Sequence, residues 1–85
     1  MSNTANPKNA GIASELRARA LALDDPELKA KAERVAEIVE RAQNEAPASI
    51  LDLPFRHLTA SEKRRGIELE AMARQLLARH GKAVA

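Results

Sequence analysis

A ten-residue segment, SILDLPFRHL at residues 49–58, constrains the fold of this chain more than any other feature. Five large apolar side chains lie in it: Ile50, Leu51, Leu53, Phe55 and Leu58. Once Met1 and Val84 near the chain ends are set aside, the chain has only 18 such side chains, because alanine supplies nearly half of its hydrophobic residues. Pro54 stands in the middle of the segment, which is therefore not expected to form one regular helix. We expect it to fold over the open end of a helical hairpin and complete a thin core.

The composition indicates one small domain without disulfide or metal crosslinks. A chain of 85 residues fits a single domain, and a domain of this size buries only about 60–65% of its unfolded surface. The absence of cysteine excludes a disulfide scaffold, a thiolate metal site and a cysteine nucleophile. The N-terminal residues are polar, unlike a secretory signal, and no apolar run approaches the ~20 residues that span a bilayer. We therefore expect a soluble, cytoplasmic protein.

Apolar periodicity predicts two helices in the first half of the chain. One is expected over residues 12–23, because apolar residues recur there at spacings of four, four and three: Ile12, Leu16, Ala20 and Leu23. The other is expected over residues 26–45, where alanine and valine alternate along one stripe. Asp25 is placed to cap this second helix, and Pro26 suits its first position. The sequence Asp-Asp-Pro thus separates the two helices.

A third helix is expected over residues 59–80. Thr59 and Glu62 fit the capping box, in which each side chain satisfies a backbone N–H at the helix start. Gly66 would then lie inside this helix at a cost of about 1 kcal/mol relative to alanine. No segment of the chain shows the alternating pattern of a β-strand. The apolar stripes of the second and third helices are expected to form an intramolecular core.

These elements predict an all-α fold, a small three-helix domain in which the apolar connector joins two long helices. The two long helices, about 26–45 and 59–80, should form an antiparallel hairpin, and the shorter helix at about 12–23 should pack against them. A homodimer that builds a four-helix core from two hairpins is the alternative. The expected domain boundaries are a disordered N-terminal tail at 1–10, a single helical domain at 11–82 and a disordered C-terminus at 83–85.

No arrangement of residues predicts catalysis, a metal site or a bound cofactor. The two histidines, His57 and His80, are 23 residues apart, and neither has a second ligand at helical spacing on the same face. The serines lie beside helix starts, where capping explains them. The three glycines are scattered and form no phosphate-binding loop. We therefore predict that the protein is not an enzyme.

Charge is unevenly distributed, although the net charge is only +2. Residues 25–46 are acidic overall, whereas residues 56–85 contain seven basic and three acidic residues. Four basic residues cluster near the start of the third predicted helix: Arg56, Lys63, Arg64 and Arg65. Three of them are adjacent in a helical turn whose dipole disfavours positive charge, which points to a phosphate or an acidic partner. No predicted helix has the aromatic residues of a membrane-surface helix, so a membrane partner is not expected.

The sequence therefore predicts a small non-enzymatic binding protein that regulates or bridges another macromolecule by protein–protein contact. The predicted contact residues combine apolar and basic side chains: Leu53, Phe55, Arg56, Leu58, Lys63, Arg64 and Arg65. The alternative is a DNA-binding regulator, of a plasmid, phage or transcription unit, that uses the same basic residues on phosphates. The oligomeric state stays open, as does whether Phe55 belongs to the core or to the surface.

Overall fold

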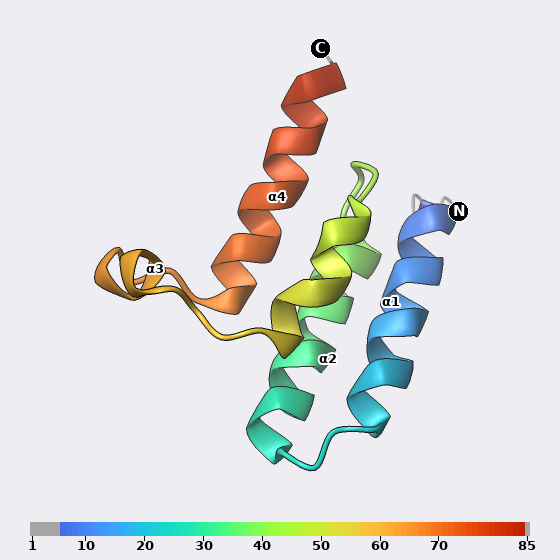
Figure 1. The fold of residues 1–85 in the computed structure, drawn as a ribbon. Helices are drawn as coiled ribbons and strands as arrows, with labels where there is room; N and C mark the ends of the chain where they lie inside the picture. The colour runs from blue at the N-terminus through green and yellow to red at the C-terminus, as the bar shows by residue number, and fades with distance from the viewer. Residues whose placement is uncertain (1–5, 85) are drawn as a thin grey trace.

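The computed structural model describes residues 6–84, with side chains over residues 6–80, and this part of the chain contains helices but no strand. The predicted all-α fold is thereby confirmed, with five helices in place of three (Figure 1). In chain order they are α1 (Pro7–Leu21), α2 (Pro26–Arg41), the 3₁₀ helix η1 (Ala48–Phe55), α3 (Ala60–Arg64) and α4 (Leu69–Val84). Residues 1–5 of the predicted tail, and residue 85, lie outside the described part.

Helix α1 begins earlier than predicted, so the disordered tail assigned to residues 1–10 is wrong from Pro7 onward. The side-chain oxygen of Asn6 accepts a hydrogen bond of 2.9 Å from the backbone N–H of Lys8, and Pro7 takes the first helical position. Asparagine before proline is a helix-start signal, because proline lacks the N–H that would otherwise need a partner there. The predicted C-terminal tail is also shorter, since α4 extends to Val84.

Helices α1 and α2 form the antiparallel hairpin at the centre of the fold (Figure 1). Asp25 caps α2 as predicted, accepting a hydrogen bond of 2.9 Å from the backbone N–H of Glu27. Helix α2 ends at Arg41, four residues before the predicted boundary, because Ala42 has extended backbone angles. Beyond it, residues 42–47 form an irregular loop, and the side chain of Asn9 in α1 makes three hydrogen bonds to its backbone.

Asn9 is the only polar residue among the fully buried side chains of the described part. Its amide nitrogen donates to the carbonyl oxygens of Ala42 (3.1 Å) and Asn44 (2.7 Å). Its amide oxygen accepts from the backbone N–H of Ala46 (2.8 Å). Asn44 in turn donates to the carbonyl of Leu77 in α4 at 3.3 Å. The buried amide therefore satisfies three loop backbone groups and ties α1 to the start of the connector.

The connector itself forms η1 and runs back along the helices, which reverses the predicted pairing of the long helices. Eight residues at about 2.0 Å each carry the chain roughly 16 Å back toward the start of α2. Helix α4 therefore begins beside the middle of α2 and runs in the same direction, so the two helices are parallel (Figure 1). The ion pair between Arg34, in the middle of α2, and Glu70, near the start of α4, agrees with this arrangement. The predicted antiparallel hairpin of these two helices is wrong.

One side of η1 is buried, as expected for a segment that completes a thin core. Ile50 and Leu53 are three residues apart and lie on the same face, because a 3₁₀ helix has three residues per turn. Pro54 is also buried, and it lies inside η1, so most of the segment forms one 3₁₀ helix in spite of the proline. Phe55 is half-buried and packs against the core cluster, which answers whether this side chain belongs to the core.

The third predicted helix is in fact two helices, α3 and α4, separated at Gly66. The N–H groups of Gly66 and Ile67 bond to the carbonyls of Lys63 and Glu62, the Schellman arrangement that ends a helix. Gly66 has a φ of +67°, a conformation that costs side-chain-bearing residues about 1–2 kcal/mol. The prediction that Gly66 lies inside a helix is therefore wrong, since it supplies the left-handed residue of a helix end.

The core lies where α1, α2, η1 and α4 meet, and α3 contributes no buried residue to it. Small and large side chains alternate, which lets the helices approach closely where alanine faces them. The buried cluster consists of Ala13, Leu16, Val35, Ala36, Val39, Ala46, Ile50, Leu53, Leu69, Met72, Ala73 and Leu77.

Candidate functional site

Helix α3 projects from the side of the molecule (Figure 1), and three of the four predicted basic residues lie in it or directly after it. Lys63, Arg64 and Arg65 are all exposed. Arg65, the residue that follows α3, donates a hydrogen bond of 3.4 Å to the hydroxyl oxygen of Ser61 in that helix. Because the chain changes direction at Gly66, α3 projects from the bundle and its basic side chains are exposed to solvent.

The base of α3 is held by its capping box, which forms as predicted. The N–H of Thr59 donates to a carboxylate oxygen of Glu62 at 2.8 Å, and the N–H of Glu62 donates to the Thr59 hydroxyl at 3.2 Å. The backbone hydrogen bond from Thr59 is the main cause that lowers the pKa of Glu62 below its ordinary value, with Arg56 and Arg65 adding to it. Glu62 is thus ionised at neutral pH, and it also accepts an ion pair of 3.4 Å from Arg56.

A hollow of about 260 Å³, here called the α3–α4 hollow, lies between the end of η1, the α3 turn and the middle of α4. Three arginines line it, Arg56, Arg65 and Arg79, and Glu62 is the one acidic residue in the lining. Its apolar surface comes from the connector and α4. The full lining is Leu53, Arg56, Glu62, Arg65, Ile67, Met72, Gln75, Leu76 and Arg79.

A second hollow of about 250 Å³, the α2–α3 hollow, lies beside the connector as well, between the start of α2 and α3. Arg56 lines both hollows, while Lys31 and Lys63 add positive charge to this one and Glu68 is its one acid. The lining consists of Leu28, Lys31, Arg56, His57, Leu58, Lys63, Glu68 and Leu69. Positive charge therefore dominates two neighbouring hollows that share the connector residue Arg56.

The structure brings five of the seven predicted contact residues to these hollows. Leu53, Arg56 and Arg65 line the α3–α4 hollow, and Arg56, Leu58 and Lys63 line the α2–α3 hollow. Leu53 is only 3% exposed, so it forms the floor of its hollow. Phe55 and Arg64 line neither hollow: Phe55 packs against the core, and Arg64 points from α3 into solvent.

Sequence reasoning missed the contribution of α4 to the α3–α4 hollow. Met72, Gln75, Leu76 and Arg79 follow the spacing i, i+3, i+4 and i+7, so one side of the helix carries all four. That spacing is visible in the sequence, and it places Arg79 on the flank of the apolar stripe. Its nearness to Arg56 and Arg65 was not visible, because it depends on the break at Gly66.

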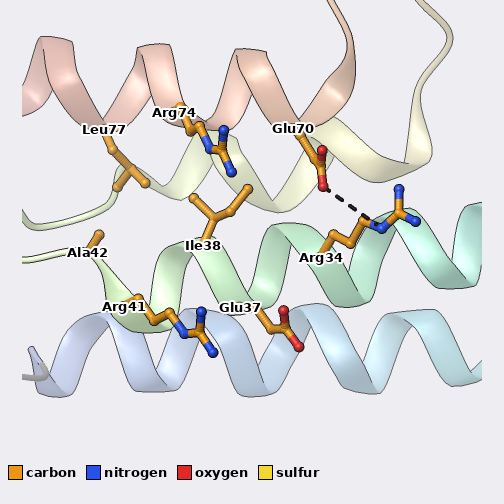
Figure 2. A pocket seen from close by; sticks show the side chains of 8 residues that line it. All are labelled: Arg34, Glu37, Ile38, Arg41, Ala42, Glu70, Arg74 and Leu77. Atoms are coloured by element: carbon orange, nitrogen blue, oxygen red, sulfur yellow. Dashed lines mark ion pairs between the residues drawn. The ribbon is translucent and has the colours of Figure 1, made fainter.

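A third concavity, the α2–α4 groove, has a volume of about 380 Å³ (Figure 2). Ile38 lies between the two helices, Arg74 reaches toward it from α4, and Glu70 points from α4 toward Arg34. The lining consists of Arg34, Glu37, Ile38, Arg41, Ala42, Glu70, Arg74 and Leu77. None of these residues belongs to the predicted contact set.

Neither a metal-binding cluster nor a membrane-spanning helix occurs among the residues that the structure describes. No group of three or more histidine, cysteine or acidic side chains in residues 6–80 is arranged to hold a metal ion. Within residues 6–84, no helix has the length and apolar character to cross a bilayer. The chain matches no protein-family model, no curated protein sequence and no solved structure.

Proposed function

We propose that this protein is a small, non-enzymatic, cytoplasmic binding protein that captures an acidic segment of another protein in the α3–α4 hollow. The observation that carries the proposal is the convergence of Arg56, Arg65 and Arg79, from three separate elements, around an apolar floor. An arginine fork matches a carboxylate with two parallel hydrogen bonds, so the three side chains favour a partner with several acidic residues.

The floor of the hollow suits an apolar anchor between those acidic residues. Leu53 and Met72 are both less than one-tenth exposed, and methionine adapts its flexible thioether to partners of different shape. A hydrophobic anchor surrounded by charge-assisted hydrogen bonds is the arrangement of a typical interface centre, where a few residues carry most of the affinity. Regulation or bridging would follow from occupancy of this hollow.

The local backbone supports the proposal because α3 is fixed at both ends. The capping box at Thr59 and Glu62 defines its start, and the Schellman hydrogen bonds around Gly66 define its end. Arg65 therefore stands on a defined turn rather than on a free loop, which lowers the ordering cost of binding. Arg56 is oriented in the same way by its ion pair with Glu62.

Fluorescence anisotropy with a labelled acidic peptide that contains two leucine anchors tests this proposal. The peptide should bind wild-type protein, and its affinity should fall as salt rises, because the contacts are charged. Arg65→Glu should weaken binding at least about tenfold, since one arginine contact is lost and one repulsive charge is added. Lys29→Glu is the matched control, because Lys29 is exposed and lines neither hollow. Equal losses in both variants would reduce the effect to net charge and refute the proposal.

Binding to duplex DNA is the second candidate, and one observation favours it. Lys63 and Arg64 at the end of α3 and Arg65 directly after it are all exposed, and only residues 65–68 separate α3 from α4, a turn length seen in helix-turn-helix proteins. The following helix, however, has Glu68 before its start and Glu70 in its first turn, which oppose a phosphate-lined groove. A salt series with a labelled duplex decides: the DNA proposal requires steeply salt-dependent binding that Arg64→Glu weakens.

A further inference from the structure

We propose that the α2–α4 groove is a second docking site, which takes a short acidic amphipathic helix from a partner protein. This inference goes beyond the proposed function, because it concerns the other flank of α4 and uses none of the residues of the α3–α4 hollow.

The groove is open because η1 covers only one side of the contact between α2 and α4. Figure 2 shows η1 behind the two parallel helices, and the front is uncovered. Ile38 is half-buried between the helices there, and Ala42 and Leu77 continue the apolar surface along the groove. Since alanine at position 42 is too small to fill the space beside Leu77, a depression remains that a larger apolar side chain would occupy.

The charges of the groove select an acidic occupant. Arg34 and Glu70 form an ion pair of 3.8 Å across one end, so they largely neutralise each other. Arg41 and Arg74 form no ion pair with any residue that the structure describes, and both border the apolar centre. Glu37 is the remaining acid of the lining. Two carboxylates of a partner, one beside Arg41 and one beside Arg74, would form ion pairs with these arginines.

The walls of the groove favour a helix over an extended peptide. Both walls are helices, whose backbone N–H and C=O groups bond mostly within the helix, so an extended peptide would find few backbone partners there. A helical occupant satisfies its own backbone and packs as a third helix on two others. From Arg34 to Arg41 the groove is about 10 Å long, the rise of two helical turns, which matches apolar anchors at i and i+4 with acidic residues beside them.

Helix α4 would then serve two sites at once. Glu70, Arg74 and Leu77 face the groove, whereas Gln75 and Arg79 face the α3–α4 hollow. The two sets of residues lie on different sides of α4, so a partner in the groove leaves the hollow accessible. A protein that bridges two acidic partners needs this separation, and the two sites can be tested one at a time.

The test uses the full chain and two synthetic helical peptides with the same leucine pattern, one flanked by glutamate and the other by lysine. The acidic peptide should bind and shift the backbone amide resonances of Ile38, Ala42 and Arg74, while the basic peptide should not. Arg74→Glu should weaken binding of the acidic peptide about tenfold or more. Lys29→Glu makes an equal charge change on an exposed side chain that lines neither the groove nor the α3–α4 hollow, and it should leave this affinity within about twofold.

Three results would overturn the inference: equal binding of both peptides, no binding of either, or an equal loss in the Arg74 and Lys29 variants. Arg41→Glu provides a second variant on an exposed side chain, so a folding defect at Arg74 does not decide the outcome. Arg65→Glu changes a residue of the α3–α4 hollow only. If this variant loses peptide binding in the hollow and keeps it in the groove, the two sites bind independently, so the proposed function and this inference can fail separately.

Discussion

Replacing Asn9 by alanine should destabilise the domain more than any other single polar truncation in α1. The change removes two donated hydrogen bonds and one accepted hydrogen bond, and it leaves the backbone groups of Ala42, Asn44 and Ala46 without their partner. At about 1 kcal/mol for each bond, the loss is roughly 3 kcal/mol. The whole domain is expected to have only about 4–13 kcal/mol of stability, so the change is a large fraction.

Aspartate at the same position tests this role more specifically, because it keeps the shape of the side chain and replaces the donating amide group by an oxygen. Asn9→Asp keeps the acceptor for the Ala46 N–H but turns an oxygen toward two carbonyl oxygens. Burial and those carbonyls favour the neutral acid, so the pKa of Asp in the folded state should be raised. The stability of this variant is then highest below the unfolded pKa of about 3.9 and falls by about 1.4 kcal/mol per pH unit above it.

Urea unfolding followed by circular dichroism measures both effects. Wild type, Asn9→Ala, Asn9→Asp and the control Asn44→Ala should be compared at several pH values between 3.5 and 7. Asn44 is exposed and donates only one long bond of 3.3 Å, so its truncation should cost less than about 1 kcal/mol. A loss below about 0.5 kcal/mol in Asn9→Ala, or an Asn9→Asp profile parallel to wild type, would refute the assigned role of the buried amide.

Four further predictions follow from individual residues. In chemical denaturation, Gly66→Ala should destabilise the domain by about 1–2 kcal/mol, because Gly66 has a positive φ. Gly11→Ala should stabilise it by about 0.5–1 kcal/mol, because Gly11 is an exposed residue inside a helix. Effects of the same sign in the two variants would contradict this prediction. Glu62 should titrate below an unfolded reference peptide by carbon-detected NMR, so its contribution to folding is present above a pH of ~4.3 and is lost as pH falls through the lowered pKa; an unshifted titration argues against the capping geometry. Phe55→Ala should cost roughly 2 kcal/mol in urea unfolding, less than for a fully buried ring, and no loss would place Phe55 outside the core. Leu21→Lys should change the unfolding free energy by less than about 0.5 kcal/mol, because Leu21 is 80% exposed, and a larger loss would mean that Leu21 is buried in solution.

Local signals in the sequence predicted several features correctly because short-range chemistry determines them. Asp25 before Pro26 fixed the start of α2, and Thr59 with Glu62 fixed the start of α3. Each cap involves residues no more than three positions apart, so no tertiary contact is needed to form it. The Asn6–Pro7 start of α1 carried the same kind of signal, and it was missed because the segment lacks apolar periodicity.

The path of the chain between the helices could not be predicted from such signals. The direction of α4 depends on whether the connector crosses an end of the bundle or runs back along it, and η1 runs back. The end of α2 at Arg41 depends on a buried amide 32 residues earlier in the chain. Gly66 was predicted to lie inside a helix because the helical pattern continues on both sides of it. The Schellman hydrogen bonds of Gly66 and Ile67 instead end α3 at this position.

The candidate site was predicted only in part, because residues close together in the sequence could be identified and distant ones could not. Arg56 and Arg65 were identified from their clustering in sequence, and they line one hollow in the structure. Arg79 was missed because it is distant in sequence and joins them only through the turn between α3 and α4. The groove beside Ile38 was missed because its two walls come from helices that were expected to run in opposite directions.

Chemical-shift mapping of isotope-labelled protein during titration with the leucine-containing acidic peptide tests the proposed function most directly. The account predicts that the backbone amides of Leu53, Arg65 and Arg79 shift together, with one binding isotherm, and that Arg65→Glu removes these shifts while the rest of the spectrum is preserved. Shifts scattered over the exposed lysines and arginines, or shifts that duplex DNA produces and the peptide does not, would contradict it.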